Sequence, residues 1–434
     1  MKNKFTLAKP EKGKNFGLSR NCISKEALAV IKVLQRAGYR SYIVGGGVRD
    51  LLLNKQPKDF DIATAAHPAK IRNLFKRCRL IGKRFRLAHV FYNGDLLEVA
   101  TFRTGPSNKT HENLSIKNWC VVSDNRYGTL EEDLMRRDFT VNAMYYDPFN
   151  DDLICHPNAL SDIEDRCLRV IGNPLQRYRE DPVRMLRGLR LATKLGLNLE
   201  QEAKRQIIPN RSLLLNIPPA RLFEECKKLF LCGALQQIFE KLRKFQLLEL
   251  LFPQTEDVLR THPKAEAFEH FLNLLFSETD RRIASAKSVN PAFTIAGLWW
   301  LSIDDRVRKQ SNKRLSHTGL WQRKTDEIAA IQHSRVAIPK YILHLIYEIY
   351  RLQPYFTSHN KSNIYSLIRS RRFRAAYDFF HLLAKAELAD MDTCQWWKTF
   401  QQVDQQQRGS MIADRIKGYS EHHLYHPVKV EARC

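Results

Sequence analysis

Apolar residues change their spacing partway along the chain. In its first quarter they gather in short runs bounded by turn residues, which is the pattern of β-strands. Four such runs are YIV at 42–44, DFDIAT at 59–64, LAHVFY at 87–92 and LLEVATFR at 96–103. The sequence NGD at 93–95 joins the last two runs and is a strong hairpin signal. We therefore predict a small sheet here, interrupted by a helix from about Pro68 to Cys78.

Beyond residue 155 strand signals nearly vanish and helical spacing takes over. We predict an α+β fold: a head with a small mixed or antiparallel sheet flanked by helices, followed by an all-helical neck, body and C-terminal region. The polar stretch at 104–128 is predicted to be a loop. The predicted segments are a basic flexible N-terminus at 1–20, the head at 21–150, the neck at 151–270 and the body with the C-terminal region at 271–434.

Charge narrows the class of partner. Lys and Arg outnumber Asp and Glu by 71 to 46, so the favoured partners are polyanions, either nucleic acid or an anionic membrane. Residues 306–374 alone carry 15 basic against 3 acidic side chains. In SRRFRAAYDFF at 370–380 basic residues alternate with aromatic ones, which suits phosphates and stacked bases, although a solvated helix face over core aromatics has the same pattern. The clustered excess favours RNA.

Several classes of protein are not favoured. The longest apolar run, at 292–303, is shorter than the ~20 residues that span a bilayer, so it predicts a buried helix and no membrane association. The N-terminus lacks the apolar core of a secretory signal, which makes a cytoplasmic location the expectation. The 9 cysteines contain no C-x-x-C pair, so neither a disulfide framework nor a zinc site is indicated.

Three consecutive glycines, 45–47, follow the first strand. A dinucleotide fingerprint requires a third glycine where this chain has Asp50, and a P-loop requires a Gly-Lys-Ser/Thr that is missing. The glycine turn must therefore serve another kind of site. It opens a helix, where backbone N–H groups can bind phosphates and Arg49 adds positive charge.

Asp59 and Asp61 stand two residues apart on the next predicted strand, so their side chains share a face about 7 Å apart. Two like charges at this separation call for a cation, and oxygen ligands of this kind suit Mg²⁺. Two such ions can activate a hydroxyl and hold a departing pyrophosphate, which is the chemistry of nucleotidyl transfer. A third carboxylate is expected nearby, and Glu98 lies on a neighbouring strand.

These motifs resemble a known family. GGGVRDLLL, KDFDIAT, RRDFTVNAMYYDP at 136–148 and REDPVRMLRGLRLATKLG at 179–196 are similar, in this order, to the class II nucleotidyltransferases, which comprise bacterial poly(A) polymerases and tRNA CCA-adding enzymes. The resemblance runs from about residue 40 to 230. It implies that the head is a nucleotidyltransferase domain and that the neck binds the nucleotide base and RNA.

The resemblance also implies roles for individual residues. Asp59 and Asp61 match metal-binding catalytic carboxylates, and Asp138 matches a further acidic position. Asp138 and Glu98 therefore compete for the role of third carboxylate, and the alternative role of Asp138 is to hold the sugar or neighbouring arginines. The implied catalytic set is Asp59, Asp61, Asp138 and Glu98, and the implied nucleotide-binding set is Gly45, Gly46, Arg49, Arg137, Asn142, Glu180, Asp181, Arg184 and Arg187.

The segment 179–196 can also be interpreted physically. Arginines and a lysine recur at helical spacing opposite Met185, Leu189 and Ala192, which an ordinary surface helix would also show. The resemblance favours a protein template instead, in which Asp181 accepts from the exocyclic amine of the incoming base and Arg184 donates to its ring nitrogens.

One segment separates the members of the family. LIGKRFRLAHV at 80–90 resembles the segment that marks bacterial poly(A) polymerases, and IPPARLFEE, VNPAFTIAGLWW and FRAAYDFF resemble their body and arginine-rich C-terminal region. The resemblance implies a template-independent polynucleotide adenylyltransferase that adds AMP from ATP to RNA 3′ ends, with Mg²⁺ as cofactor and RNA-decay proteins as partners. The alternatives are a tRNA CCA-adding enzyme and an RNA-binding protein with a degenerate head.

Overall fold

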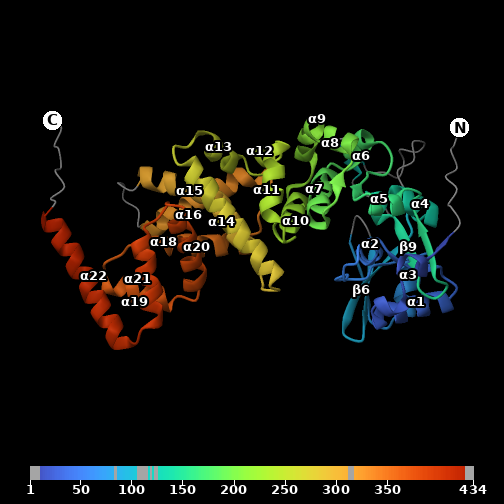
Figure 1. Ribbon diagram of the computed structural model, residues 1–434, viewed down its shortest axis with the longest axis horizontal. Helices are drawn as coiled ribbons and strands as arrows, with labels where there is room; N and C mark the ends of the chain where they lie inside the picture. Colours follow the sequence, from blue (N-terminus) through green and yellow to red (C-terminus); the bar gives the residue numbers. More distant parts are fainter. Residues whose placement is uncertain are drawn as a thin grey trace. The chain divides into compact units, whose positions relative to one another are not determined.

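The computed structural model describes residues 10–82, 86–104, 116–117, 120–121, 126–310 and 317–425. Predictions that fall on 1–9, on 83–85 of the LIGKRF segment, on most of the loop at 104–128 or on 311–316 lie outside these residues. The chain folds into two compact units, 1–217 and 218–434 (Figure 1). The predicted boundaries at 150 and 270 differ from this division and stay predictions.

The first unit is built on a mixed sheet of eight strands in the order β1-β10-β9-β2-β3-β6-β5-β4. The strands are β1 Glu11–Lys12, β2 Ser41–Val44, β3 Ile62–Thr64, β4 Cys78–Ile81, β5 Leu87–Tyr92, β6 Asp95–Thr101, β9 Met144–Asp147 and β10 Asp152–Cys155. Strand β3 pairs antiparallel with β2 and parallel with β6. Asn93 and Gly94, both at positive φ, join β5 to β6 and confirm the predicted hairpin.

The first unit also contains helices. They are η1 Gly13–Phe16, η2 Arg20–Cys22, α1 Lys25–Arg36, α2 Gly46–Leu52, α3 Pro68–Leu74, α4 Leu130–Arg136, η3 Thr140–Asn142, α5 Ala159–Glu164, α6 Pro174–Glu180, α7 Val183–Leu195, α8 Gln201–Arg205, α9 Ile207–Asn210 and η4 Arg211–Asn216. Short pairs of strands are β7 Ile116–Lys117 with β8 Cys120–Val121, and β11 Cys167–Leu168 with β12 Asn198–Leu199.

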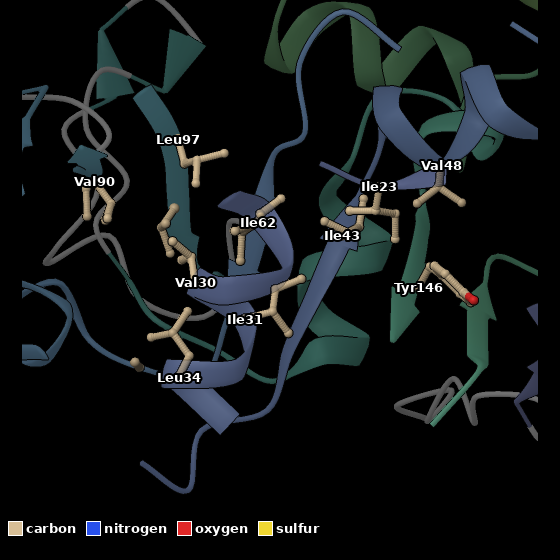
Figure 2. Close-up of a cluster of buried hydrophobic side chains, with 14 of the residues drawn as sticks. Ile23, Val30, Ile31, Leu34, Ile43, Val48, Ile62, Val90, Leu97 and Tyr146 are labelled. Atoms are coloured by element: carbon tan, nitrogen blue, oxygen red, sulfur yellow. The ribbon is translucent and has the colours of Figure 1, made fainter. Parts of the chain in front are cut away.

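Helix α1 supplies the core on one side of the sheet. Ser24 caps it by accepting a hydrogen bond from the Ala27 N–H at 3.2 Å, and its apolar positions recur at helical spacing. Figure 2 shows Val30, Ile31 and Leu34 of this helix in one buried cluster with residues of the strands. Burial of this apolar stripe fixes the helix on the sheet.

The structure differs from three predictions about the head. The strand expected to begin at Asp59 begins at Ile62. The helix expected to reach Cys78 ends at Leu74, because Phe75 takes an extended conformation and the chain enters β4. Residues 11–12, assigned from sequence to a flexible N-terminus, pair with β10, which itself extends the sheet beyond residue 150.

The second unit contains no strand among its described residues. Its helices are α10 Pro219–Phe230, α11 Leu235–Lys244, α12 Leu248–Leu251, α13 Pro253–Thr261, α14 Ala265–Ala284, α15 Pro291–Gln310, α16 His317–His333, α17 Lys340–Tyr350, α18 Gln353–Phe356, α19 Lys361–Arg369, α20 Phe373–Lys385, α21 Met391–Gln402 and α22 Gln405–Tyr425. The apolar run at 292–303 is a largely buried part of α15, as predicted. No helix in the described ranges is long and apolar enough to cross a membrane. The α+β fold with a helical remainder is confirmed.

Candidate active site

Three predicted carboxylates line one cavity of about 910 Å³ in the head. Asp59 and Asp61 come from the segment that leads into β3, and Glu98 comes from β6. Because Ile62 pairs with Val99 in the parallel ladder, the residues before them, Asp61 and Glu98, lie next to each other. The strand register therefore brings together two carboxylates that are 37 residues apart in sequence.

Asp61 is under electrostatic stress in this cavity. Part of Asp61 reaches solvent, but the protein atoms around its carboxyl group desolvate it. This desolvation and the negative charges of Glu98 and Asp59 raise the pKa of Asp61 to about 6. The positive charge of Arg137 opposes the rise without cancelling it. Glu98 is half exposed and lies 3.5 Å from Nε2 of His89 across the hairpin. Nearby negative charge disfavours the ionised form of Asp61, and a bound cation would stabilise that form.

The glycine turn packs against this carboxylate segment. Gly45, at φ 68° and ψ −117°, precedes α2, and its N–H donates to the carbonyl of Met144 at 3.0 Å. The N–H groups available to a phosphate are therefore those of Gly46 and the residues after it, not that of Gly45. A Cβ on Gly47 would lie 3.2 Å from the Phe60 ring, so the absence of a side chain lets the turn approach the carboxylate segment.

Arg137 connects the turn to the carboxylates. A Cβ on Gly45 would lie 3.3 Å from its Nη1, and its charge acts on Asp61. Nε of Arg137 donates to the Tyr145 hydroxyl at 2.7 Å, and Nη2 donates to Asp133 at 3.1 Å. The guanidinium also lies 4.9 Å from the centre of the Tyr145 ring. These contacts hold Arg137 in one orientation beside the turn.

Asp133 anchors Arg137, and sequence reasoning missed it. The residue is 1% exposed and also binds Arg136 and the Tyr145 hydroxyl. Burial alone would raise its pKa, but Arg137, Arg136 and Tyr145 lower it to about 2. The signal was present, because Asp133 precedes the two arginines by three and four residues on one helix, the spacing of helical ion pairs.

Asp138 lies in a different environment from the cavity carboxylates and does not line that cavity. Its carboxylate accepts from Nε of Arg187 at 2.9 Å and from the Asn142 amide at 3.0 Å. Burial favours the neutral acid, but the charge of Arg187, the Asn142 hydrogen bond and the charge of Arg184 hold its pKa well below the usual range. Asp138 is thus an ionised group committed to neighbouring side chains.

Arg49 continues this network into the glycine helix. It is 7% exposed, donates from Nη1 to the Asn142 side chain at 2.6 Å, and pairs with Asp50 at 2.6 Å. A chain of polar contacts therefore runs from Arg49 through Asn142 and Asp138 to Arg187 on α7. We name it the Arg49–Arg187 network.

The junction of α6 and α7 holds the remaining predicted residues. Glu180 ends α6 and accepts from Arg177 at 2.7 Å and from Arg184 at 3.2 Å. Nη2 of Arg177 also donates to the carbonyl of Arg136 at 2.6 Å, while burial and the nearby Arg184 lower the pKa of Arg177 to about 10. Asp181 lies between the two helices, at the foot of α7. The basic face of α7 is partly exposed and its apolar face buried, as its sequence predicts.

Sequence reasoning missed another wall of the carboxylate cavity. Asn21 and Cys22 of η2 and Ser24, the N-cap of α1, line the same cavity as the acidic segment, although they are far from it in sequence. No local pattern signals this contact, because it arises from the way the N-terminal segment folds back on the sheet.

The carboxylates of the cavity are oxygen donors of the kind that Mg²⁺ prefers. No group of three or more His, Cys, Asp or Glu side chains in the described part of the chain is arranged to hold a metal by itself. Mg²⁺, however, is usually held by one or two carboxylates and completes its shell with water and substrate phosphates. Asp59 and Asp61 line one cavity, and the raised pKa of Asp61 reflects nearby negative charge that a cation would offset, so the pair fits such an ion.

Comparison with family models gives three matches along the chain. The model described as poly A polymerase head domain matches residues 41–169. The probable RNA and SrmB-binding site of polymerase A matches residues 196–259, and the polymerase A arginine-rich C-terminus matches residues 313–426.

Relatives agree with these models. Poly(A) polymerase I of Haemophilus influenzae is 36% identical over 430 residues, which cover 98% of this chain and 95% of the relative. A CCA-adding enzyme of Lactobacillus johnsonii is also 36% identical, but over 49% of this chain and 52% of its own. The solved Thermotoga maritima CCA-adding enzyme complexed with tRNA shares the fold, with a TM-score of 0.57, 19% identity and coverage of 88% of this chain and 86% of the other.

Proposed function

The chain belongs to the family of bacterial poly(A) polymerases, and on that premise we propose how its head performs polynucleotide adenylyl transfer. The RNA 3′ hydroxyl attacks the α-phosphate of ATP, the bond to the bridging oxygen breaks, and pyrophosphate leaves. The observation that carries the assignment of the site is the single cavity lined by Asp59, Asp61 and Glu98.

Asp59 and Asp61 hold the metal in this proposal. Mg²⁺ ions held there would supply the positive charge that lowers the pKa of the attacking hydroxyl and offsets the charge that develops on the phosphate. Glu98 is the third carboxylate because it lies beside Asp61 in the strand register. The carboxylates also orient the hydroxyl toward the α-phosphate by keeping both groups within one cavity.

The triphosphate binds at the glycine turn, beside the carboxylate cavity. The N–H of Gly46 and the guanidinium of Arg137 face it, while Gly45 allows the backbone to turn without a side chain. Arg49 has a supporting role, because three of its N–H groups already bind Asp50 and Asn142. Pyrophosphate leaves along this side.

Asp138 is a positioning residue in this proposal. It holds Asn142 and Arg187, which contact the ribose and phosphates. At the α6–α7 junction Asp181 and Arg184 read the adenine edge, and Glu180 fixes the orientation of Arg184. RNA is the second substrate, RNA-decay proteins are partners, and the cytoplasm is the place of action.

The first experiment compares nucleotides. Purified protein with Mg²⁺ and a short unstructured RNA should produce long ladders with ATP and almost no product with CTP. The tRNA CCA-adding alternative predicts instead three additions to tRNA that lacks its 3′ end, followed by a stop. That result would overturn the choice of activity.

The second experiment tests the site. Asp59→Asn and Asp61→Asn should each lower AMP incorporation by about a thousandfold or more, because the metal contributes several kcal/mol to the transition state. RNA affinity should stay within about twofold, since neither residue is a basic RNA contact. Asp152→Asn, which removes a carboxylate from an exposed ion pair with Lys12, is the matched control. Unchanged incorporation in both variants would overturn this mechanism, whereas no incorporation by the parent chain would favour an RNA-binding protein with a degenerate head.

A further inference from the structure

Two cavities adjoin along one helix of the second unit. The first, of about 790 Å³, is lined by parts of α17, α18 and α19 and by the turn that follows α19. The second, of about 480 Å³, lies between α19, α20, α21 and α22. Tyr365 and Arg369 of α19 line both. We call the two cavities together the α19 groove.

The groove is strongly basic. Arg351, Arg369, Arg371, Arg372 and Arg408 line it, and Glu348 is its single acidic residue. Glu348 is neutralised by a paired hydrogen bond with Arg351, at 2.7 and 2.9 Å, and this contact lowers its pKa, with His344 and Arg372 adding to the effect. The remaining charge of the groove is therefore positive.

Arg369, Arg371 and Arg372 of the groove are exposed. Among the described residues no carboxylate forms an ion pair with Arg369 or Arg371, whereas the neighbouring Arg374 pairs with Asp378 at 3.0 Å. A segment that places like charges close together without internal partners disfavours the compact state unless an anion binds. The fold therefore leaves these guanidinium groups for an external ligand.

Aromatic rings stand within the same groove. Tyr365 is half-buried between its two cavities, with the Arg369 guanidinium 5.8 Å from the ring centre, and Tyr355 lines the first cavity. Rings interleaved with arginines suit a ligand that alternates phosphates with flat bases. A duplex does not offer this combination, because its bases are stacked inside the helix and only its phosphates reach the surface.

We propose that the α19 groove binds single-stranded RNA, with backbone phosphates on Arg369 and Arg371 and a base stacked on Tyr365. This inference rests on the proposed function, since it concerns the RNA substrate. It goes beyond the family comparison, whose probable RNA-binding segment is at residues 196–259 and contains none of these residues.

The test measures RNA affinity without ATP. Binding of the full chain to a fluorescein-labelled 20-nucleotide oligo(A) is followed by fluorescence anisotropy between 50 and 200 mM salt. The variant Arg369→Ala/Arg371→Ala should weaken binding about tenfold or more and lower the log–log salt slope by about 1.4, since each phosphate contact to a single strand contributes about 0.7. Tyr365→Leu should weaken binding about tenfold, and Tyr365→Phe, which keeps the ring, should stay within about twofold of the parent chain.

A matched control removes the same amount of charge elsewhere. Arg323→Ala/Arg374→Ala deletes two exposed arginines, 64% and 76% exposed, that are paired with carboxylates and do not line the groove. If this control weakens binding as much as the groove variant, or if the groove variant binds oligo(A) like the parent chain, the inference is wrong. If the groove variants lose affinity for duplex RNA as much as for single-stranded RNA, the proposed stacking of bases on the rings is wrong.

The two proposals fail separately. The binding assay contains neither ATP nor Mg²⁺, so an error in the assignment of the active site in the head leaves its outcome unchanged. In AMP incorporation the groove variant should raise the KM for oligo(A) about tenfold and leave kcat within about twofold, because no groove residue belongs to the head. A fall in kcat with an unchanged KM would contradict the groove and leave the adenylyltransferase activity in place.

Discussion

Replacement of Asp138 by Asn distinguishes a positioning residue from a metal ligand. In the structure Asp138 is 11% exposed at its side chain and binds Arg187, Asn142 and the N–H of Phe139. The amide of Asn keeps the size of the side chain but removes its charge. It also turns an N–H group toward either Arg187 or Asn142, both of which already present donors.

The expected cost follows from these contacts. Breaking a fully buried ion pair costs about 3–5 kcal/mol, because one charge is left without a partner. Arg187 keeps 33% of its side chain exposed, so water solvates it in part, and we expect about 2–3 kcal/mol. Asp152→Asn, at an ion pair that is 31% and 51% exposed, should cost less than about 1 kcal/mol and is the control.

The stability difference should depend on pH in a defined direction. The folded pKa of Asp138 is lowered, so its contribution is complete above the pKa of an unfolded Asp, about 3.9, and is lost as pH falls toward the folded value. The unfolded chain takes up the proton first in this interval. The gap between the parent chain and Asp138→Asn should therefore be constant from pH 8 to 5 and smaller by about 0.7 kcal/mol at pH 3.5.

Hydrogen–deuterium exchange measures this loss within the first unit. Peptides from 138–147 and from α7 should exchange about 30- to 150-fold faster in Asp138→Asn, the equivalent of 2–3 kcal/mol at one decade per 1.36 kcal/mol. Peptides from α20, in the second unit, should be unchanged. The concentration of Mg²⁺ at half-maximal activity should also be unchanged, whereas Glu98→Gln should raise it. Equal exchange in both chains, together with a higher Mg²⁺ requirement in Asp138→Asn, would refute the positioning role.

Three further outcomes are expected. Gly45→Ala should lower stability by about 1–2 kcal/mol because of its positive φ, and should raise the KM for ATP because a Cβ would lie 3.3 Å from Arg137. Gly17→Ala is the control, since Gly17 has φ 76° and open space around it. It should show the stability loss in thermal melting and no change in KM. The Mg²⁺ concentration for half-maximal activity should rise about tenfold per pH unit below pH 6, since the raised pKa of Asp61 makes protons compete with the metal there, and a flat profile between pH 7 and 5 would exclude this competition. Tyr145→Phe should lower the free energy of unfolding by about 1–3 kcal/mol, because Nε of Arg137 loses its buried acceptor. Denaturant unfolding monitored by hydrogen–deuterium exchange measures this loss, and no change would mean that water replaces the hydroxyl.

Sequence predicted the parts of the site that depend on local spacing. Asp59 and Asp61 were predicted together because alternate residues of an extended segment point to the same side, and both line the cavity although the regular strand begins only at Ile62. The faces of α7 followed from the helical period. Strand β4, Cys78–Ile81, was not predicted. The apolar residues around it are too few to show a period, so the preceding helix was predicted to continue to Cys78, although it ends at Leu74.

Partnerships between distant segments could not be predicted. The pair of Asp138 and Arg187 spans 49 residues, and nothing in either segment indicates the other. For that reason sequence alone left open whether Asp138 or Glu98 completes the carboxylate set, although the resemblance named both. The lining of the cavity by Asn21 and Cys22 was invisible for the same reason, since it depends on tertiary folding of the N-terminal segment.

The parallel pairing of β3 with β6 has a consequence for how the protein becomes active during folding. The hairpin of β5 and β6 is local and can form within microseconds, but β3 and β6 are separated by a helix and two strands. Until they pair, Asp61 and Glu98 belong to separate parts of the chain. On the proposed function, a head in which β3 and β6 have not paired would lack Glu98 beside Asp61, so its carboxylate set would be incomplete even with an intact hairpin.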